Sequence, residues 1–167
     1  LHNLVIDLTG QETERKEAEP YKAQNFRITD DHLGEGGAKT KYAFNIAAIQ
    51  TLKRIEAEGR QATPQEQETL SKYVGWGGLP QAFDAENASW QKEYQQLKSL
   101  LTDEEYAAAR GSTLNAHYTS PVVIRAMYEA LDSMGFQDGN VLEPACGVGN
   151  FFGMLPEEMQ SSKLYGM

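Results

Sequence analysis

The stretch that most constrains this chain lies near its end, where two apolar residues run into a glycine-bearing bend. Val141 and Leu142 follow the turn residues 138–140, a pattern that predicts a short buried strand. Gly147 and Gly149 then frame a Gly-x-Gly loop, and glycine lets the backbone turn tightly and approach a ligand closely. A strand, such a loop and a helix start place free N–H groups and the positive end of a helix beside the strand's carboxyl end. The stretch therefore predicts a nucleotide or cofactor site.

The residues around the loop narrow the class of cofactor. The dinucleotide pattern G-x-G-x-x-G requires glycine at position 152, where this chain has Phe152. A nicotinamide or flavin site is therefore not favoured. Glu143 at the strand end is followed by Pro-Ala-Cys-Gly-x-Gly-Asn-Phe, which ends at Phe151. This order closely resembles the S-adenosylmethionine-binding motif of the N6-adenine DNA methyltransferases.

A second motif precedes the glycine loop by about twenty residues. The segment 118–121 reads Tyr-Thr-Ser-Pro and leads into an apolar helical pattern from Val122 to Met134, through Val123 and Met127 among others. Ser120 as N-cap and Pro121 at the first position predict where that helix begins. The segment resembles the motif numbered ten in the same methyltransferases, whose helix packs on the sheet beside the cofactor strand. The resemblance covers about residues 115–167.

The resemblance implies a set of cofactor-binding residues. They are Tyr118, Thr119, Pro121, Glu143, Pro144, Ala145, Gly147, Gly149 and Phe151. By this resemblance Thr119 and Pro121 line the methionine end of the cofactor, and Glu143 contacts its amino-acid moiety directly or through water. Ala145 and the two glycines let the backbone approach, while Phe151 packs under the site. A carboxylate suits a cofactor that carries an ammonium and a sulfonium, although Glu143 also fits a helix cap or a surface carboxylate.

The apolar pattern of residues 34–111 predicts a helical region. From Ala38 to about Glu58 one apolar stripe recurs at spacings of four and three, made of Tyr42, Ile46, Ile49, Leu52 and Ile55. Gly59 ends this helix. Further helices are expected at about 64–74, at about 89–101 and from 102 onward, the first and last of them beginning with a Thr-x-x-Glu capping box.

Two features of this helical region allow more than one interpretation. Trp76, within Gly-Trp-Gly-Gly-Leu-Pro, either stacks on a nucleic-acid base or fills a gap between helices. The basic residues of the first helix and its end either contact phosphates or form a solvated face; they are Lys39, Lys41, Lys53, Arg54 and Arg60. The region also resembles the one that precedes the methylase in very large methylase and helicase fusion proteins of bacterial mobile elements and phages.

Composition restricts the protein class. A net charge of −9 argues against a free-standing DNA-coating protein, because a phosphate-binding surface needs clustered Lys and Arg. The single cysteine, Cys146, excludes an internal disulfide and a cysteine-based zinc cluster. No apolar run approaches the ~18 residues of a membrane span and no export signal is present. We therefore expect a cytoplasmic protein without a membrane partner and without a metal site.

These observations predict a mainly α N-terminal region followed by the start of an α/β Rossmann-like methyltransferase fold. Residues 1–33 are expected to form a linker or extended arm, 34–111 the helical region and 112–167 the beginning of the methyltransferase domain. The expected cofactor is S-adenosylmethionine. The expected function is that of the cofactor-binding half of a DNA adenine-N6 methyltransferase, with DNA as partner of the parent protein and a helicase domain in the same polypeptide. The alternatives are a helical DNA- or protein-interaction module with a vestigial methylase, and a fragment of a protein or RNA methyltransferase.

We expect residues 1–167 to transfer no methyl group by themselves. The Asn/Asp-Pro-Pro-aromatic motif that grips the target adenine in the resembling enzymes is missing, because none of the six prolines stand in pairs. The strand expected at Lys163–Met167 also ends before the family's ribose-binding acid. A flipped adenine then has no pocket for its amino group. In an assay with labelled S-adenosylmethionine and duplex DNA, label in N6-methyladenosine above the enzyme-free blank would contradict this assignment.

Overall fold

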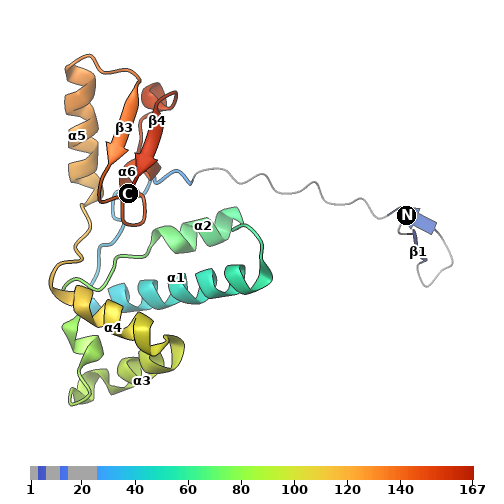
Figure 1. The fold of residues 1–167 in the computed structure, drawn as a ribbon, viewed down its shortest axis with the longest axis vertical. Helices are drawn as coiled ribbons and strands as arrows, with labels where there is room; N and C mark the ends of the chain where they lie inside the picture. Colours follow the sequence, from blue (N-terminus) through green and yellow to red (C-terminus); the bar gives the residue numbers. More distant parts are fainter. Residues whose placement is uncertain (1–3, 7–11, 15–25) are drawn as a thin grey trace.

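The computed structural model describes residues 4–6, 12–14 and 26–167, and this part of the chain is mainly helical with a small parallel sheet (Figure 1). The helices are α1 Ala38–Glu58, α2 Pro64–Ser71, α3 Gln91–Leu100, α4 Asp103–Gly111, α5 Pro121–Ser133 and α6 Asn150–Gly153. Short 3-10 helices occur at Pro80–Phe83, Ala88–Trp90, Ser112–Leu114 and Glu157–Met159. The strands are β1 Leu4–Ile6, β2 Glu12–Glu14, β3 Asn140–Glu143 and β4 Lys163–Gly166. β1 pairs with β2 in antiparallel fashion, and β3 with β4 in parallel.

The structure describes only part of residues 1–33, the segment that was expected to form an arm. Most of residues 1–25 lie outside them, so the expected linker cannot be compared with structure there. The segment from Phe26 onward is described and it contacts the rest of the chain. The Ile28 N–H donates to the Gly153 carbonyl of α6 at 2.8 Å. None of the helices in the described residues combines the length and the apolar character that a membrane crossing requires.

The ends of the helices follow local capping signals. α1 has the predicted bounds, and Gly59 at its C-cap adopts the left-handed conformation with φ 60°. At the start of α2 the Thr63 hydroxyl accepts from the Glu66 N–H and the Glu66 carboxylate accepts from the Thr63 N–H, which completes the capping box. The predicted box at the start of α4 is also present. α2, however, ends at Ser71 instead of about residue 74.

A buried asparagine explains this early end. Asn45 of α1 is completely buried, and its Oδ1 accepts from the Val74 N–H at 2.9 Å. Its Nδ2 donates to the Gly75 carbonyl at 2.6 Å. Because both backbone groups bond to Asn45, the chain leaves the helix and enters the left-handed conformation of Gly75, φ 70°. The contact lies between residues far apart in sequence, so no local signal reports it.

The helical region has its own apolar core, and Trp76 is part of it. The buried members are Tyr42, Ile46, Trp76, Leu79, Ala82, Phe83, Trp90, Leu97 and Ala109. The Trp76 ring is 3% exposed and lies 6.1 Å from the Tyr42 ring and 5.3 Å from the Phe83 ring, measured between centroids. Trp76 therefore fills a gap between elements, which confirms the packing interpretation and leaves the ring unavailable for stacking on a base. Leu52 departs from the predicted buried stripe, since it is 45% exposed.

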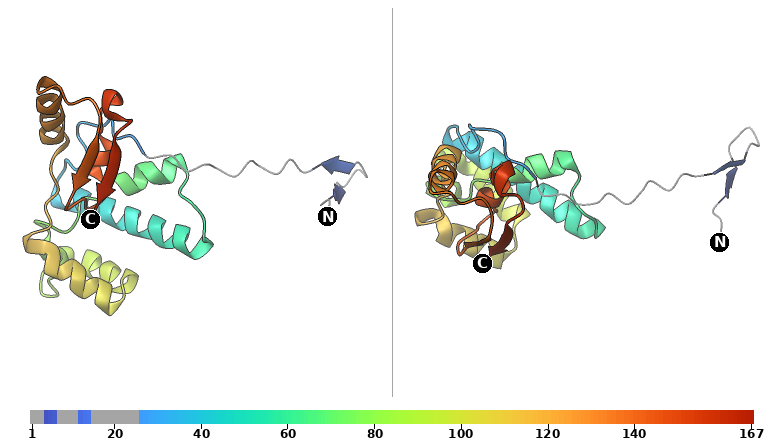
Figure 2. Two further views of the ribbon diagram at one scale, coloured as in Figure 1. Left: turned by 45° about the horizontal axis from the view of Figure 1, so that its top comes forward. Right: turned by 90° about the horizontal axis from the view of Figure 1, so that it is seen from above.

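The sheet lies above the helical region, with α5 alongside it (Figures 1 and 2). The second core cluster contains Ile124, Tyr128, Leu155 and Met159, and Leu164 of β4 packs against it. The prediction of a buried strand at β3 was wrong for Leu142, which is 59% exposed. Successive strand residues point to opposite faces, and only the face that carries Val141 and Leu164 is covered in the described residues.

The predicted helix at α5 is confirmed, and the structure shows which of its apolar residues are buried. Ile124 and Tyr128 are buried, whereas Val123 and Met127 are 46% and 50% exposed. Both sets of residues recur at helical spacing, so periodicity alone does not select between them. Pro121 occupies the first helical turn as predicted, and Ser120 takes the N-cap position, although its side chain makes no capping hydrogen bond.

Replacement of Asn45 by alanine tests the role of the buried amide. Asn45→Ala leaves the Val74 N–H and the Gly75 carbonyl without their partner and creates a cavity, so we expect a loss of about 2–4 kcal/mol in the free energy of unfolding. The matched control is Gln50→Ala on the exposed side of α1, which we expect to change stability by less than about 0.5 kcal/mol. Urea unfolding followed by circular dichroism measures both. Equal stability of the two variants would contradict the proposed role.

Candidate functional site

The glycine loop, residues 144–149, joins β3 to α6 and is folded by contacts of its own. Gly147 and Gly149 have φ values of 52° and 80°, in the left-handed region that favours glycine. The Gly149 N–H donates to the Cys146 carbonyl at 2.7 Å. The Glu143 Oε1 accepts from the Ala145 N–H at 3.2 Å, so the carboxylate at the end of β3 holds the first turn of the loop.

The ring of Tyr118 packs between Gly75 and Gly147, which belong to different parts of the chain. A Cβ atom at Gly147 would lie 2.5 Å from Tyr118 Cε1, and a Cβ atom at Gly75 would lie 2.6 Å from Tyr118 Cε2. Such distances are too short for a side chain at either position, so both sites require glycine. One ring thus joins the glycine loop, the segment before α5 and the glycine-rich turn of the helical region.

A second tyrosine extends this contact. The Tyr73 ring packs edge-to-face on Tyr118, with centroids 6.3 Å apart and planes at 68°. Burial, with the neighbouring Tyr118 as a smaller cause, raises the pKa of Tyr73 to about 12. Burial also raises the pKa of Tyr118. Both phenols therefore stay protonated at neutral pH and keep a hydroxyl that can donate a hydrogen bond.

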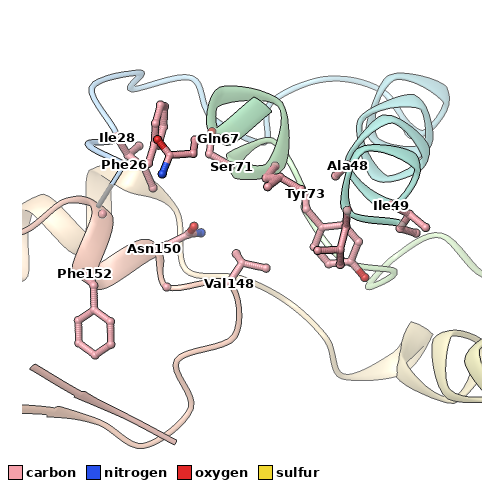
Figure 3. Close-up of a pocket in the computed structure, with 14 residues that line it drawn as sticks. Phe26, Ile28, Ala48, Ile49, Gln67, Ser71, Tyr73, Val148, Asn150 and Phe152 are labelled. Carbon is pink, nitrogen blue, oxygen red and sulfur yellow. The ribbon is translucent and has the colours of Figure 1, made fainter. Parts of the chain in front are cut away.

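Two cavities lie on either side of this contact. The first, called here the polar cavity, has a volume of about 310 Å³ and is lined by residues that include Lys41, His117, Tyr118, Thr119, Ser120 and Pro121. The second, the apolar cavity, has about 620 Å³ and lies between α1, α2 and α6 (Figure 3). Its lining includes Phe26, Ile28, Ile49, Leu52, Leu70 and Gly149. Tyr73 and Asn150 line both cavities, so the two spaces adjoin there.

The predicted site residues are divided between the cavities and the loop behind them. Tyr118, Thr119 and Pro121 line the polar cavity, and Gly149 lines the apolar cavity. The remaining predicted residues lie outside both linings; they are Glu143, Pro144, Ala145, Gly147 and Phe151. Among these, Phe151 packs on the second core cluster.

Phe151 is held through its backbone by α5. Its carbonyl accepts from the Tyr128 hydroxyl at 2.7 Å, which ties the first turn of α6 to that helix. Burial raises the pKa of Tyr128, and the charge of Glu143 adds to this shift. The phenol therefore remains a hydrogen-bond donor, and the Phe151 side chain packs on the second core cluster.

Several lining residues were not predicted from the sequence. Asn150 follows the second loop glycine, and its Oδ1 is buried with no hydrogen-bond partner among the described residues. In Figure 3 its side chain extends from the start of α6 toward the space beside α2. A polar residue directly after Gly-x-Gly was a signal for this position. No sequence signal placed Ile49 and Leu52 of α1 at a cavity, because their position depends on how α1 meets α6. The exposure of Leu52 is now explained, since it lines the apolar cavity.

The basic residues of α1 and its end form two groups. Four of them are paired with carboxylates, as Lys39 with Glu93, Lys53 with Glu105, Arg54 with Glu66 and Arg60 with Glu66. These four form a solvated, ion-paired face, one of the two interpretations that the sequence allowed. Lys41 differs from them because it is half-buried and lines the polar cavity.

Comparisons of this chain with protein-family models, with curated proteins and with solved structures find no match in any of the three. The functional proposal therefore depends on the geometry of this site and on the two sequence motifs that meet in it.

Gly77 provides a test of the contact between the helical region and the segment before α5. Its N–H donates to the Ala116 carbonyl at 3.2 Å, and a Cβ atom there would lie 2.2 Å from the same oxygen. Gly77→Ala must displace residues 116–118, so we expect a loss of about 1–3 kcal/mol in the free energy of unfolding. The control is Gly111→Ala at the end of α4, where nothing lies within 4 Å of the new Cβ. That variant should be neutral or more stable by about 0.4–1 kcal/mol, and equal unfolding midpoints would contradict the close contact.

Proposed function

We propose that this chain is the cofactor-binding part of an S-adenosylmethionine-dependent methyltransferase that modifies the exocyclic amino group of adenine in DNA. The observation that carries the proposal is the contact between the Tyr118 ring and the backbone of Gly147. These residues come from two motifs that the sequence connects to the same cofactor. Two chance motifs have no reason to meet in space, whereas two halves of one binding site must. In this proposal β3, the glycine loop, α6 and β4 are the start of a Rossmann-like sheet.

The two cavities fit the two chemical ends of such a cofactor. The polar cavity, lined by Thr119, Ser120 and Lys41, suits its charged amino-acid end. The apolar cavity suits the adenine ring of the adenosyl end, which is planar and can pack against apolar side chains. Gly149 opens to the apolar cavity with nothing within 4 Å of its Cβ position, so a ligand can approach its backbone. The Oδ1 of Asn150, a residue that lines both cavities, is a buried acceptor for which the described residues supply no donor.

Each residue of the site has a binding or positioning role. When bound, the cofactor supplies a methyl group on a sulfonium, and the chain supplies orientation and electrostatics. Glu143 lies outside both cavity linings and acts as a positioning residue, because its carboxylate holds the glycine loop through the Ala145 N–H. Thr119 and Pro121 form the wall of the methionine end. Phe151 anchors the loop to α5 through the Tyr128 hydroxyl.

DNA adenine is the proposed substrate because a Tyr-Thr-x-Pro segment precedes the glycine motif. A helical DNA-docking module is the less favoured reading, since the residues that it would use are engaged within the fold. Trp76 is buried, and four of the five basic residues of α1 and its end are ion-paired. The net charge of −9 favours a protein substrate as the second candidate, because a DNA-binding surface needs clustered positive charge.

Binding of S-adenosylmethionine to the chain, measured by isothermal titration calorimetry, tests the proposal. Gly149→Ala introduces a methyl group where the ligand approaches, so we expect the Kd to rise at least about tenfold. The matched control is Gly135→Ala, because the two glycines have φ values of 80° and 83° and nothing lies within 4 Å of either Cβ position. Both variants carry the same backbone strain of about 1 kcal/mol, so only Gly149→Ala should weaken binding. Absence of binding by the wild-type chain, or an equal effect of both variants, would refute the site.

A further inference from the structure

Lys41 is the one basic residue of α1 for which the ion pairs of the described residues provide no carboxylate. It is half-buried, and it lines the polar cavity. A lysine is rarely buried without a partner, because removing its charge from water costs free energy that only an opposite charge or hydrogen bonds offset. The lining of the polar cavity therefore includes a partly buried lysine that is not ion-paired with a carboxylate of the described residues.

The other groups around this cavity are also arranged for an anion. Ser120 stands at the N-cap of α5, yet its hydroxyl makes no capping hydrogen bond and remains available. Thr119 contributes a second hydroxyl to the same lining. Two acids also line the cavity, and both contact other side chains: Asp31 is paired with Arg125, and the Glu35 carboxylate lies 3.0 Å from the His32 ring nitrogen. Lys41, Ser120 and Thr119 offer one ammonium and two hydroxyl groups, which suit a small group with anionic oxygens.

The position of Lys41 on α1 connects this cavity to the apolar one. Ala48 and Leu52 follow it by seven and eleven residues on the same helix, and both line the apolar cavity. These spacings place all three residues on one face of α1. Two turns separate Lys41 from Ala48, about 11 Å along the helix. A ligand with an anionic end and an apolar end can therefore lie along this face and occupy both cavities.

We propose that Lys41 binds the carboxylate of the cofactor's methionine moiety, assisted by the hydroxyl groups of Thr119 and Ser120. The inference rests on the proposed function and extends it, because Lys41 lies in the helical region and outside both cofactor motifs. A carboxylate fits this recess better than a nucleic-acid phosphate, since the cavity adjoins the apolar one at Tyr73 and Asn150. The helical region thus completes the cofactor site and selects ligands that carry the carboxylate.

The test compares S-adenosylmethionine with its decarboxylated form, which lacks only the carboxylate. The Kd of each is measured by calorimetry on the full chain. The wild type should bind the complete cofactor at least about tenfold more tightly. Lys41→Gln should weaken binding of the complete cofactor about tenfold and leave the decarboxylated form within about twofold, and Lys41→Arg should restore most of the preference. The control is Lys92→Gln on the exposed side of α3, which should change neither Kd.

The outcomes separate this inference from the proposed function. If the wild type binds both ligands equally, or if Lys41→Gln weakens both to the same extent, the role of Lys41 is overturned while the cofactor site stands. If the wild type binds neither ligand, the proposed function fails and the inference fails with it. Thermal unfolding of Lys41→Gln, compared with Lys92→Gln, confirms that a lost preference does not come from a lost fold.

Discussion

The fold of this chain depends on one steric constraint, the ring of Tyr118 held between the backbones of Gly75 and Gly147. A Cβ atom at either glycine would displace the ring. The contact therefore requires glycine at both positions, although they lie far apart in the sequence. The contact joins the helical region to the glycine loop and leaves a polar cavity and an apolar cavity beside it. Tyr73 and Asn150 line both cavities.

Two residues of the helical region fix the glycine-rich turn that contacts Tyr118. Asn45 fixes the backbone at Gly75 by two hydrogen bonds, and Trp76 anchors the same turn in the apolar core. Most of the basic residues of α1 and its end are ion-paired with carboxylates. The charge that is not neutralised, at Lys41, faces the polar cavity. The helical region therefore contributes to the polar cavity in two ways, by fixing the backbone at Gly75 and by placing Lys41 in the cavity lining.

The sequence predicted what local chemistry decides. The capping boxes at Thr63 and Thr102 and the glycine at the end of α1 gave helix boundaries, because their hydrogen bonds lie within a few residues. Features that depend on distant contacts were not predictable in this way. The end of α2 is set by Asn45, and the exposed face of β3 at Leu142 depends on which elements cover the sheet. In the same way, the motifs gave the loop and the Tyr118 segment, while the contribution of α1 to the cavities follows only from its position across the apolar cavity from α6.

The most direct test of a shared site is photochemical cross-linking of labelled S-adenosylmethionine to the chain, followed by mapping of the labelled tryptic peptides. A site built from the helical region and the segment before α5 predicts label in peptide 73–92, which begins with Tyr73, and in peptide 111–125, which contains Tyr118. Excess S-adenosylhomocysteine should abolish both signals. Label absent from peptide 73–92, or label that the competitor does not remove, would contradict the account that one site is formed by both parts of the chain.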